Sequence, residues 1–166
     1  MEFLREVDAV NIRRRDRVVE MAELALGALD GARICVLGAA FKPGSDDVRD
    51  SPALDVANRL FRGGARVTVF DPAAGLTGRA VAPGLRFAAN AAVALRNADL
   101  VLHLTEWPEF RDLDPGELGP VVRRRVLIDA RNALDVDRWR AAGWTVQAPG
   151  RHLDGYRPQP VEVTTR

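Results

Sequence analysis

The residues best suited to bind an anion lie in one stretch of the sequence, residues 39–50. It contains Arg49 and Lys42, and Lys42 is the only lysine among the 24 basic residues of the chain. Because all the other basic residues are arginine, the single lysine indicates that position 42 needs a compact ammonium group. Three aspartates in the same stretch leave a second interpretation open, in which the loop forms only local ion pairs.

Two further segments combine aromatic or charged side chains after predicted strands. One contains Trp107 and Phe110, which we interpret as caps of the hydrophobic core. The other contains Arg131, whose guanidinium could pair with Asp129 or Asp135 or could bind a phosphate through two parallel hydrogen bonds. The sequence alone leaves these alternatives open.

Three candidate catalytic or metal-ligating residues are set aside by their positions. Cys35 and His103 fall in the middle of predicted buried strands, where a thiol is unreactive, and His152 lies near the end of the chain. No group of Cys, His and carboxylate residues has the spacing of a metal site. We therefore predict no catalytic residue and no metal, and the chemistry alone indicates a binding module.

Short apolar segments alternate with helix-like segments from residue 33 onward. Strands are predicted at residues 33–38, 66–70, 85–87, 100–104, 126–129 and 144–147, and helices at residues 52–62, 90–97, 115–124 and 136–142. This alternation predicts an α/β fold with a doubly wound, mainly parallel, Rossmann-like sheet. Ligands of such sheets bind beyond the carboxyl ends of the strands, so the segments that follow the strands should converge there. The first strand is not followed by the G-x-G-x-x-G pattern of a dinucleotide site.

A long helix is predicted at the start of the chain, over residues 3–29. Apolar residues recur there at steps of three and four, and no proline interrupts them. We interpret this helix as a connector between domains or as the seam of a dimer. Its arginines, Arg13, Arg14, Arg15 and Arg17, are interpreted as a solvated face in preference to a phosphate-binding patch.

Length and composition restrict the class of protein. The chain has 166 residues, enough for one domain with an appendage, and we divide it into the helix of residues 1–30, an α/β domain of residues 31–151 and a loose tail of residues 152–166. The net charge of +1 predicts neither a nucleic-acid nor a membrane partner. The absence of a signal-peptide pattern and the single cysteine indicate a cytoplasmic location.

Four ordered motifs together resemble a known family. They are AFKPGSDDVRDSPA at residues 40–53, VTVFDP at residues 67–72, TEWPEF at residues 105–110 and DARNALD at residues 129–135. In this combination the chain resembles the C-terminal, UDP-binding domain of UDP-glucose 6-dehydrogenases, over about residues 7–151. These enzymes belong to the UDP-glucose/GDP-mannose dehydrogenase family and use NAD to oxidise UDP-glucose to UDP-glucuronate through a cysteine-bound intermediate.

The resemblance implies roles for four residues. Phe41, Lys42 and Arg131 would contact the UDP-sugar, and Arg49 would reach an NAD bound mainly by another domain. The long helix would match the connector through which these enzymes form homodimers. The NAD fingerprint and the catalytic cysteine are absent from these residues, so we expect part of a larger enzyme that does not turn over alone. Two alternatives remain: a separate nucleotide-sugar-binding module, or a dimerising domain without catalysis.

Overall fold

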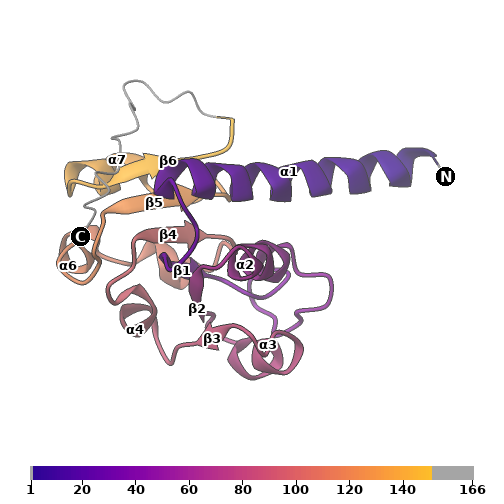
Figure 1. Cartoon of the computed structure of the whole chain (residues 1–166), viewed down its shortest axis with the longest axis horizontal. Coiled ribbons are helices and arrows are strands. Elements are labelled where there is room, and N and C mark those ends of the chain that lie inside the picture. Colours follow the sequence, from indigo (N-terminus) through magenta and orange to yellow (C-terminus); the bar gives the residue numbers. More distant parts are fainter. Residues whose placement is uncertain (1, 151–166) are drawn as a thin grey trace.

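Six parallel strands form one sheet at the centre of the molecule (Figure 1). The computed structural model describes residues 2–150, with side chains described from residue 9 onward. The strands are β1 (Arg33–Leu37), β2 (Arg66–Phe70), β3 (Arg86–Phe87), β4 (Leu100–His103), β5 (Val126–Asp129) and β6 (Thr145–Gln147). Their order is β3-β2-β1-β4-β5-β6, and every neighbouring pair is parallel. The order reverses between β1 and β4, which confirms the predicted doubly wound α/β fold.

Helices cover both faces of this sheet. They are α1 (Glu2–Leu26), α2 (Pro52–Arg62), α3 (Gly75–Val81), α4 (Ala91–Leu95), α5 (Pro108–Arg111), α6 (Pro115–Leu118) and α7 (Val136–Ala141). Connections between parallel strands are right-handed. The connections from β1 to β3 therefore place α2 and α3 on one face. The connections from β3 to β6 run in the opposite direction across the sheet and therefore place α4 to α7 on the opposite face.

Helix α1 covers the part of the α2 face that the connecting helices leave open. It packs against α2 and against β4 and β5, and its residues Val18, Met21 and Ala22 are buried in the core. The helix ends at Leu26, three residues before its predicted end, because the next residue, Gly27, has the left-handed φ of 78° that commonly ends helices. No helix within residues 2–150 has both the length and the apolar composition needed to cross a bilayer.

The start of α2 is fixed by Ser51 and Pro52. The Ser51 hydroxyl accepts a hydrogen bond from the Leu54 N–H at 3.3 Å, and Pro52 supplies the backbone angle of a first helical residue. The same hydroxyl donates to the Ala39 carbonyl at 2.5 Å. This one side chain therefore joins the start of α2 to the loop that follows β1.

Three predicted elements differ from the structure. Residues 73–89, where only the short strand of residues 85–87 is predicted, also contain α3, and the segment after β4 contains the unpredicted α5. The helix predicted over residues 115–124 reaches only Leu118. Gly119 still has helical angles, but the next residue, Pro120, has no N–H to continue the hydrogen bonds of the helix. All three differences lie in short helices, where the periodic signal is weakest.

Gly38, the first residue after β1, allows β1 and the segment after β4 to approach each other closely. It has a φ of 102°, and a Cβ placed there would lie 2.4 Å from the Thr105 Cβ and 2.6 Å from the Thr105 N. We expect Gly38→Ala to lower the free energy of unfolding by about 3 kcal/mol, measured by urea denaturation. Gly44→Ala is the matched control, because Gly44 has a φ of 77° and open space around it, and should cost only about 1 kcal/mol. Equal losses in the two variants would contradict this account.

Candidate functional site

A cleft of about 390 Å³ opens at the carboxyl edge of the sheet. It lies between α1, the start of α2 and the segments that follow β4 and β5. Its walls are formed by Asn11, Arg14, Arg15, Val18, Pro52, Ala53, Val56, Leu104, Ala130, Arg131, Asn132 and Pro149. Three of these residues are arginines and none is acidic, so the cleft favours an anion.

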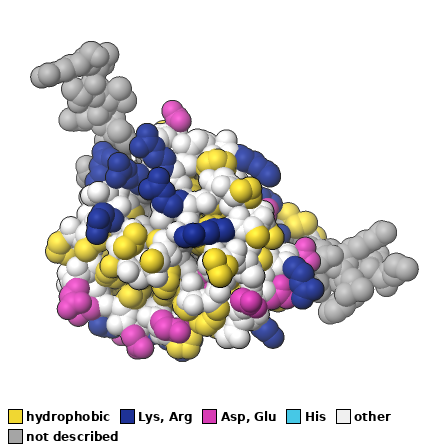
Figure 2. Space-filling model, turned by 90° about the horizontal axis from the view of Figure 1, so that it is seen from below, with side chains coloured by type: hydrophobic (Ala, Val, Ile, Leu, Met, Phe, Trp, Pro, Cys, Tyr) yellow, Lys and Arg dark blue, Asp and Glu magenta, His cyan; other side chains and the backbone are white. Residues whose placement is uncertain are grey.

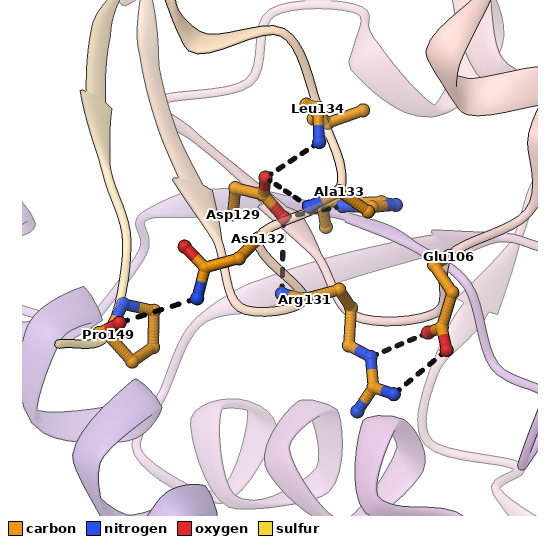
Figure 3. A network of polar contacts seen from close by, with 8 residues as sticks. Glu106, Asp129, Arg131, Asn132, Ala133, Leu134 and Pro149 are labelled. Atoms are coloured by element: carbon orange, nitrogen blue, oxygen red, sulfur yellow. Dashed lines mark hydrogen bonds and ion pairs between the residues drawn. The ribbon is translucent and has the colours of Figure 1, made fainter. Parts of the chain in front are cut away.

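Arg131 is positioned by the buried carboxylate of Asp129 at the end of β5 (Figure 3). Asp129 Oδ1 accepts the Arg131 N–H at 3.1 Å, and Oδ2 accepts the N–H groups of Ala133 and Leu134, each at 2.9 Å. Asn132, between them, has a left-handed φ of 52°. Asp129 therefore bends the segment after β5 back over the strand end and directs the Arg131 side chain outward.

The guanidinium of Arg131 pairs with Glu106, which follows β4. Arg131 Nε and Nη2 donate to the two Glu106 carboxylate oxygens at 2.6 and 2.9 Å (Figure 3). Neither Asp129 nor Asp135 is the ion-pair partner, because Asp129 binds the Arg131 backbone and Asp135 caps α7. The hydrogen bonds from Arg131 lower the pKa of Glu106. The pair leaves the Arg131 Nη1 group outside these two hydrogen bonds and holds the guanidinium plane in one orientation.

Asp129 also forms a buried pair with His103, whose Nδ1 lies 2.8 Å from Asp129 Oδ1. Burial raises the pKa of Asp129, but the hydrogen bonds from His103 and from the Leu134 N–H outweigh it, so the pKa lies below its usual value. The stability that ionised Asp129 contributes is therefore complete well above the unfolded-state pKa of about 3.9. It is lost as the pH falls through the lower, folded-state pKa.

We expect Asp129→Asn to cost the most stability near neutral pH and progressively less below about pH 4. Urea denaturation of both proteins between about pH 3 and pH 6 measures this difference. Asp114→Asn serves as the control, because Asp114 is an exposed helix cap that binds one N–H. A stability difference between Asp129→Asn and the parent that does not change with pH would contradict the inference that ionised Asp129 stabilises the fold.

A second buried carboxylate, Asp71 at the end of β2, holds the segment after β1. Its Oδ2 accepts the N–H groups of Ala39 and Ala40 at 2.7 and 2.9 Å and the Trp107 Nε1 at 3.0 Å. Its Oδ1 accepts two N–H groups that follow β2, those of residues 73 and 74, at 2.9 and 2.8 Å. One carboxylate therefore joins the segments that follow β1, β2 and β4.

Phe41, Lys42 and Arg49 follow this anchored segment, outside the lining of the cleft. Phe41 and Lys42 are exposed, and Arg49 is 87% exposed. Arg49 Nε and Nη2 donate to the two oxygens of Asp47 at 2.9 and 2.7 Å, and these hydrogen bonds lower the pKa of Asp47 to about 2. The local ion pair that the sequence left open is therefore present. The structure brings Arg131 into the cleft and leaves the other three predicted residues on a neighbouring surface loop.

Sequence reasoning missed the contribution of α1 to the cleft. The interpretation of its arginines as a solvated face holds for Arg13 and Arg17, which are exposed. Arg14 is exposed as well, but it also lines the cleft. The interpretation is wrong for Arg15, which lines the cleft, is half-buried and places its Nη1 3.5 Å from Asp55 Oδ2. Positions 14 and 15 precede the buried Val18 by four and three residues, and that spacing already places them beside the core stripe.

The interpretation of the two aromatic residues after β4 as core caps is confirmed. Trp107 and Phe110 are both buried, and the Trp107 indole also binds Asp71. Cys35 is buried in β1, and burial raises the pKa of its thiol, so it stays protonated. Among residues 2–150, no three His, Cys, Asp or Glu side chains gather as ligands for a metal ion. His152 lies outside the described residues.

Known proteins match this chain in sequence and in fold. The family described as "UDP-glucose/GDP-mannose dehydrogenase family, UDP binding domain" matches residues 35–136. A UDP-glucose 6-dehydrogenase of Bacillus subtilis is 31% identical over 151 residues, which are 90% of this chain and 33% of the relative. Another, of Haloferax volcanii, is 45% identical over 106 residues, 64% of this chain and 24% of the relative.

A solved structure shares the fold at similar sequence identity. The UDP-glucose dehydrogenase of Pyrobaculum islandicum superposes with a TM-score of 0.69 at 33% identity, over 84% of this chain and 32% of that one. The chain thus spans about a third of the length of the relatives it matches. The match begins inside β1, at Cys35, and includes β5 and the segments that hold Phe41, Lys42 and Arg131. We conclude that the chain belongs to the UDP-glucose/GDP-mannose dehydrogenase family and contains the UDP-binding domain of that family.

Proposed function

We propose that the chain is the UDP-sugar-binding part of an NAD-dependent UDP-glucose 6-dehydrogenase, which oxidises UDP-glucose to UDP-glucuronate. The observation that carries this proposal is the position of Arg131. Its guanidinium is oriented by Glu106 and its backbone by Asp129, and it lines a cleft with two other arginines and no acid. Guanidinium groups bind phosphate through parallel hydrogen bonds, so the cleft suits the diphosphate of a nucleotide sugar.

The loop after β1 supplies the remaining contacts in this proposal. Lys42 and Phe41 are exposed on a segment whose base is fixed by Asp71, so they can meet a ligand without reordering the sheet. Lys42 contributes a compact positive charge and Phe41 an apolar surface. Because Asp71 also binds Trp107, this loop and the segment that carries Glu106 are anchored to the same carboxylate.

In this proposal NAD accepts the hydride, and residues other than those of the cleft and the loop after β1 bind most of it. The turn after β1 lacks the dinucleotide fingerprint, and α2 begins only at Pro52, so β1 and α2 do not form the usual pyrophosphate turn. Arg49 fits a secondary contact with such a cofactor. The Nε and Nη2 groups of Arg49 donate to Asp47, so the Nη1 group lies on the other side of the guanidinium. The Arg49 side chain is exposed, so a cofactor can reach this group.

We also propose a homodimer formed through α1. The helix extends well past the sheet toward its N-terminal end (Figure 1), and Val10 and Ile12 are 38% and 50% exposed there. We expect the chain to sediment as a dimer in analytical ultracentrifugation and Ile12→Glu to shift it to the 18.2 kDa monomer. Leu76→Glu, on the exposed surface of α3, is the control. A monomeric parent chain would contradict the dimer.

Ligand-observed NMR of the 166-residue chain tests the function. We expect saturation-transfer signals with UDP-glucose and much weaker signals with ADP-glucose, because a uridine-specific site discriminates between the bases. NAD alone should give little signal, since most of its proposed contacts lie elsewhere. Equal signals with both sugar nucleotides would overturn the UDP-sugar assignment in favour of a nonspecific anion cleft. No signal with either would overturn the proposal that these residues bind the substrate.

A further inference from the structure

A second concave surface lies at the opposite, amino-terminal edge of the sheet. This groove has a volume of about 970 Å³ and runs between the starts of β1 and β2, strand β3 and the end of α4. Three parallel strands begin there, and the first residue of each is an arginine: Arg33, Arg66 and Arg86. Arg79 and Arg96 also line the groove. We call this set of five the arginine groove.

The strand register places three of these arginines on one face of the sheet. Arg33 and Arg66 are direct partners in the β1–β2 pair, and Arg86 is the partner of Thr68, two residues after Arg66. Side chains two residues apart on a strand share a face, so Arg33, Arg66 and Arg86 project together. Like charges directly opposite each other on neighbouring strands are destabilising, and guanidinium groups do not lose their charge.

The described part of the chain offers these arginines little neutralisation. The residues that line the groove include no Asp or Glu. The nearest acid in the strand register, Asp99 before β4, accepts the Arg33 backbone N–H at 2.9 Å and pairs with Arg123. Arg79 is fixed to the sheet through a hydrogen bond of 2.8 Å to the Phe87 carbonyl.

The concentration of positive charge is local. The whole chain carries a net charge of only +1, so the groove does not reflect a generally basic protein. Figure 2, which views the molecule from the side of β3, shows Lys and Arg side chains gathered on one part of this face, while most acidic side chains lie along its lower rim. Such a local field attracts anions with several charges more strongly than single ones.

We propose that the arginine groove binds a small oligophosphate, at a site separate from the cleft that holds Arg131. Guanidinium forks match phosphate oxygens, and several forks on one face suit a ligand with several phosphate groups. The half-exposed Phe61 and Val93 at its rim provide apolar surface for an organic group on that ligand. The volume lies at the upper end of the range for small-molecule sites. The proposal does not depend on the function proposed for the cleft.

Isothermal titration of the full chain with inorganic triphosphate, ATP and hexaglutamate tests this site at low salt. We expect one triphosphate to bind per chain and the affinity to fall as salt is added. The double variant Arg66→Ala/Arg86→Ala should bind it at least about tenfold more weakly. The control is Arg111→Ala/Arg140→Ala, which removes the same charge from exposed helix positions outside the groove and should bind as the parent does.

Two arms of the experiment separate the possible ligands and sites. Tighter binding of ATP than of triphosphate identifies an organic oligophosphate, and equal binding identifies the phosphate chain alone; both support the site. Triphosphate should also raise the melting temperature of the parent chain but not that of the groove double variant. A cooperative melting transition of that variant without ligand, like that of the parent, excludes misfolding as the cause. Equal losses in the groove and control variants, or binding of hexaglutamate as tight as triphosphate, would overturn the proposal. Arg131→Ala should leave triphosphate binding at the groove unchanged, whatever it does to UDP-glucose.

Discussion

Arg131→Ala is expected to weaken UDP-glucose binding by about tenfold to a hundredfold, the loss of one charge-assisted, bidentate phosphate contact. The fold should survive, because Asp129 holds the segment through the backbone N–H of residue 131 and not through its side chain. The Arg131–Glu106 pair is partly exposed, at 44% and 30%, so its loss should cost less than about 1 kcal/mol of stability. NMR titration of the full chain measures the affinity.

Two variants separate the contribution of the two parallel donors of Arg131 from the contribution of its positive charge. Arg131→Lys retains one positive charge but not the two parallel donors, so it should recover only part of the lost affinity. Arg140→Ala removes a charge from the exposed surface of α7 and should bind UDP-glucose as the parent does. If Arg131→Ala binds like Arg140→Ala, then Arg131 does not contact the nucleotide, and its pairing with Glu106 is only structural.

Asp71→Asn is expected to produce the largest loss of stability, about 3–5 kcal/mol. Asp71 accepts five hydrogen bonds and has no donor to satisfy. An amide of the same shape presents an NH₂ group to two or three of these N–H donors, which then lose their acceptor in a buried site. Because Ala39 and Ala40 are among them, the loop that carries Lys42 should also loosen and UDP-glucose binding should weaken.

The same acid-to-amide change at Asp114 provides the comparison. Asp114 is exposed and accepts one N–H at the start of α6, so Asp114→Asn should cost less than about 1 kcal/mol. Trp107→Phe removes a single donor and leaves the carboxylate of Asp71 intact, and should fall between the two. Urea denaturation of the three variants measures the order. An Asp71→Asn protein within about 1 kcal/mol of the parent would show that Asp71 does not anchor these segments.

The strands were predictable because both faces of this sheet are covered. Buried parallel strands become continuous apolar runs, and those at residues 33–38 and 126–129 agree with β1 and β5 to within one residue. Helix α2 was predictable from its cap and its proline. Helices α3 and α5 have seven and four residues, too few to establish a period of 3.6, and they depend on tertiary contacts that the sequence does not display.

The site was predictable in its position but not in its contacts. A residue that follows a parallel strand lies at the carboxyl edge, and this reasoning located Arg131 correctly. It did not identify Glu106 as the ion-pair partner, because the two residues lie 25 positions apart and meet only through the pairing of β4 with β5. It also missed Arg14 and Arg15, because a helix's position over a sheet depends on packing. The clearest unused signal was an aspartate at the carboxyl end of a strand: Asp71 directly follows β2, and Asp129 is the last residue of β5.

The packing of α1 couples the cleft mechanically to whatever touches the far end of this helix. Its C-terminal half is part of the core, its middle lines the cleft through Arg14 and Arg15, and its N-terminal half extends past the sheet. A helix rises about 1.5 Å per residue, so a tilt of about 5° at Val18 displaces Glu2 by about 2 Å. If an anion in the cleft draws Arg14 and Arg131 together, α1 tilts, and its N-terminal end therefore moves farther than the residues in the cleft do.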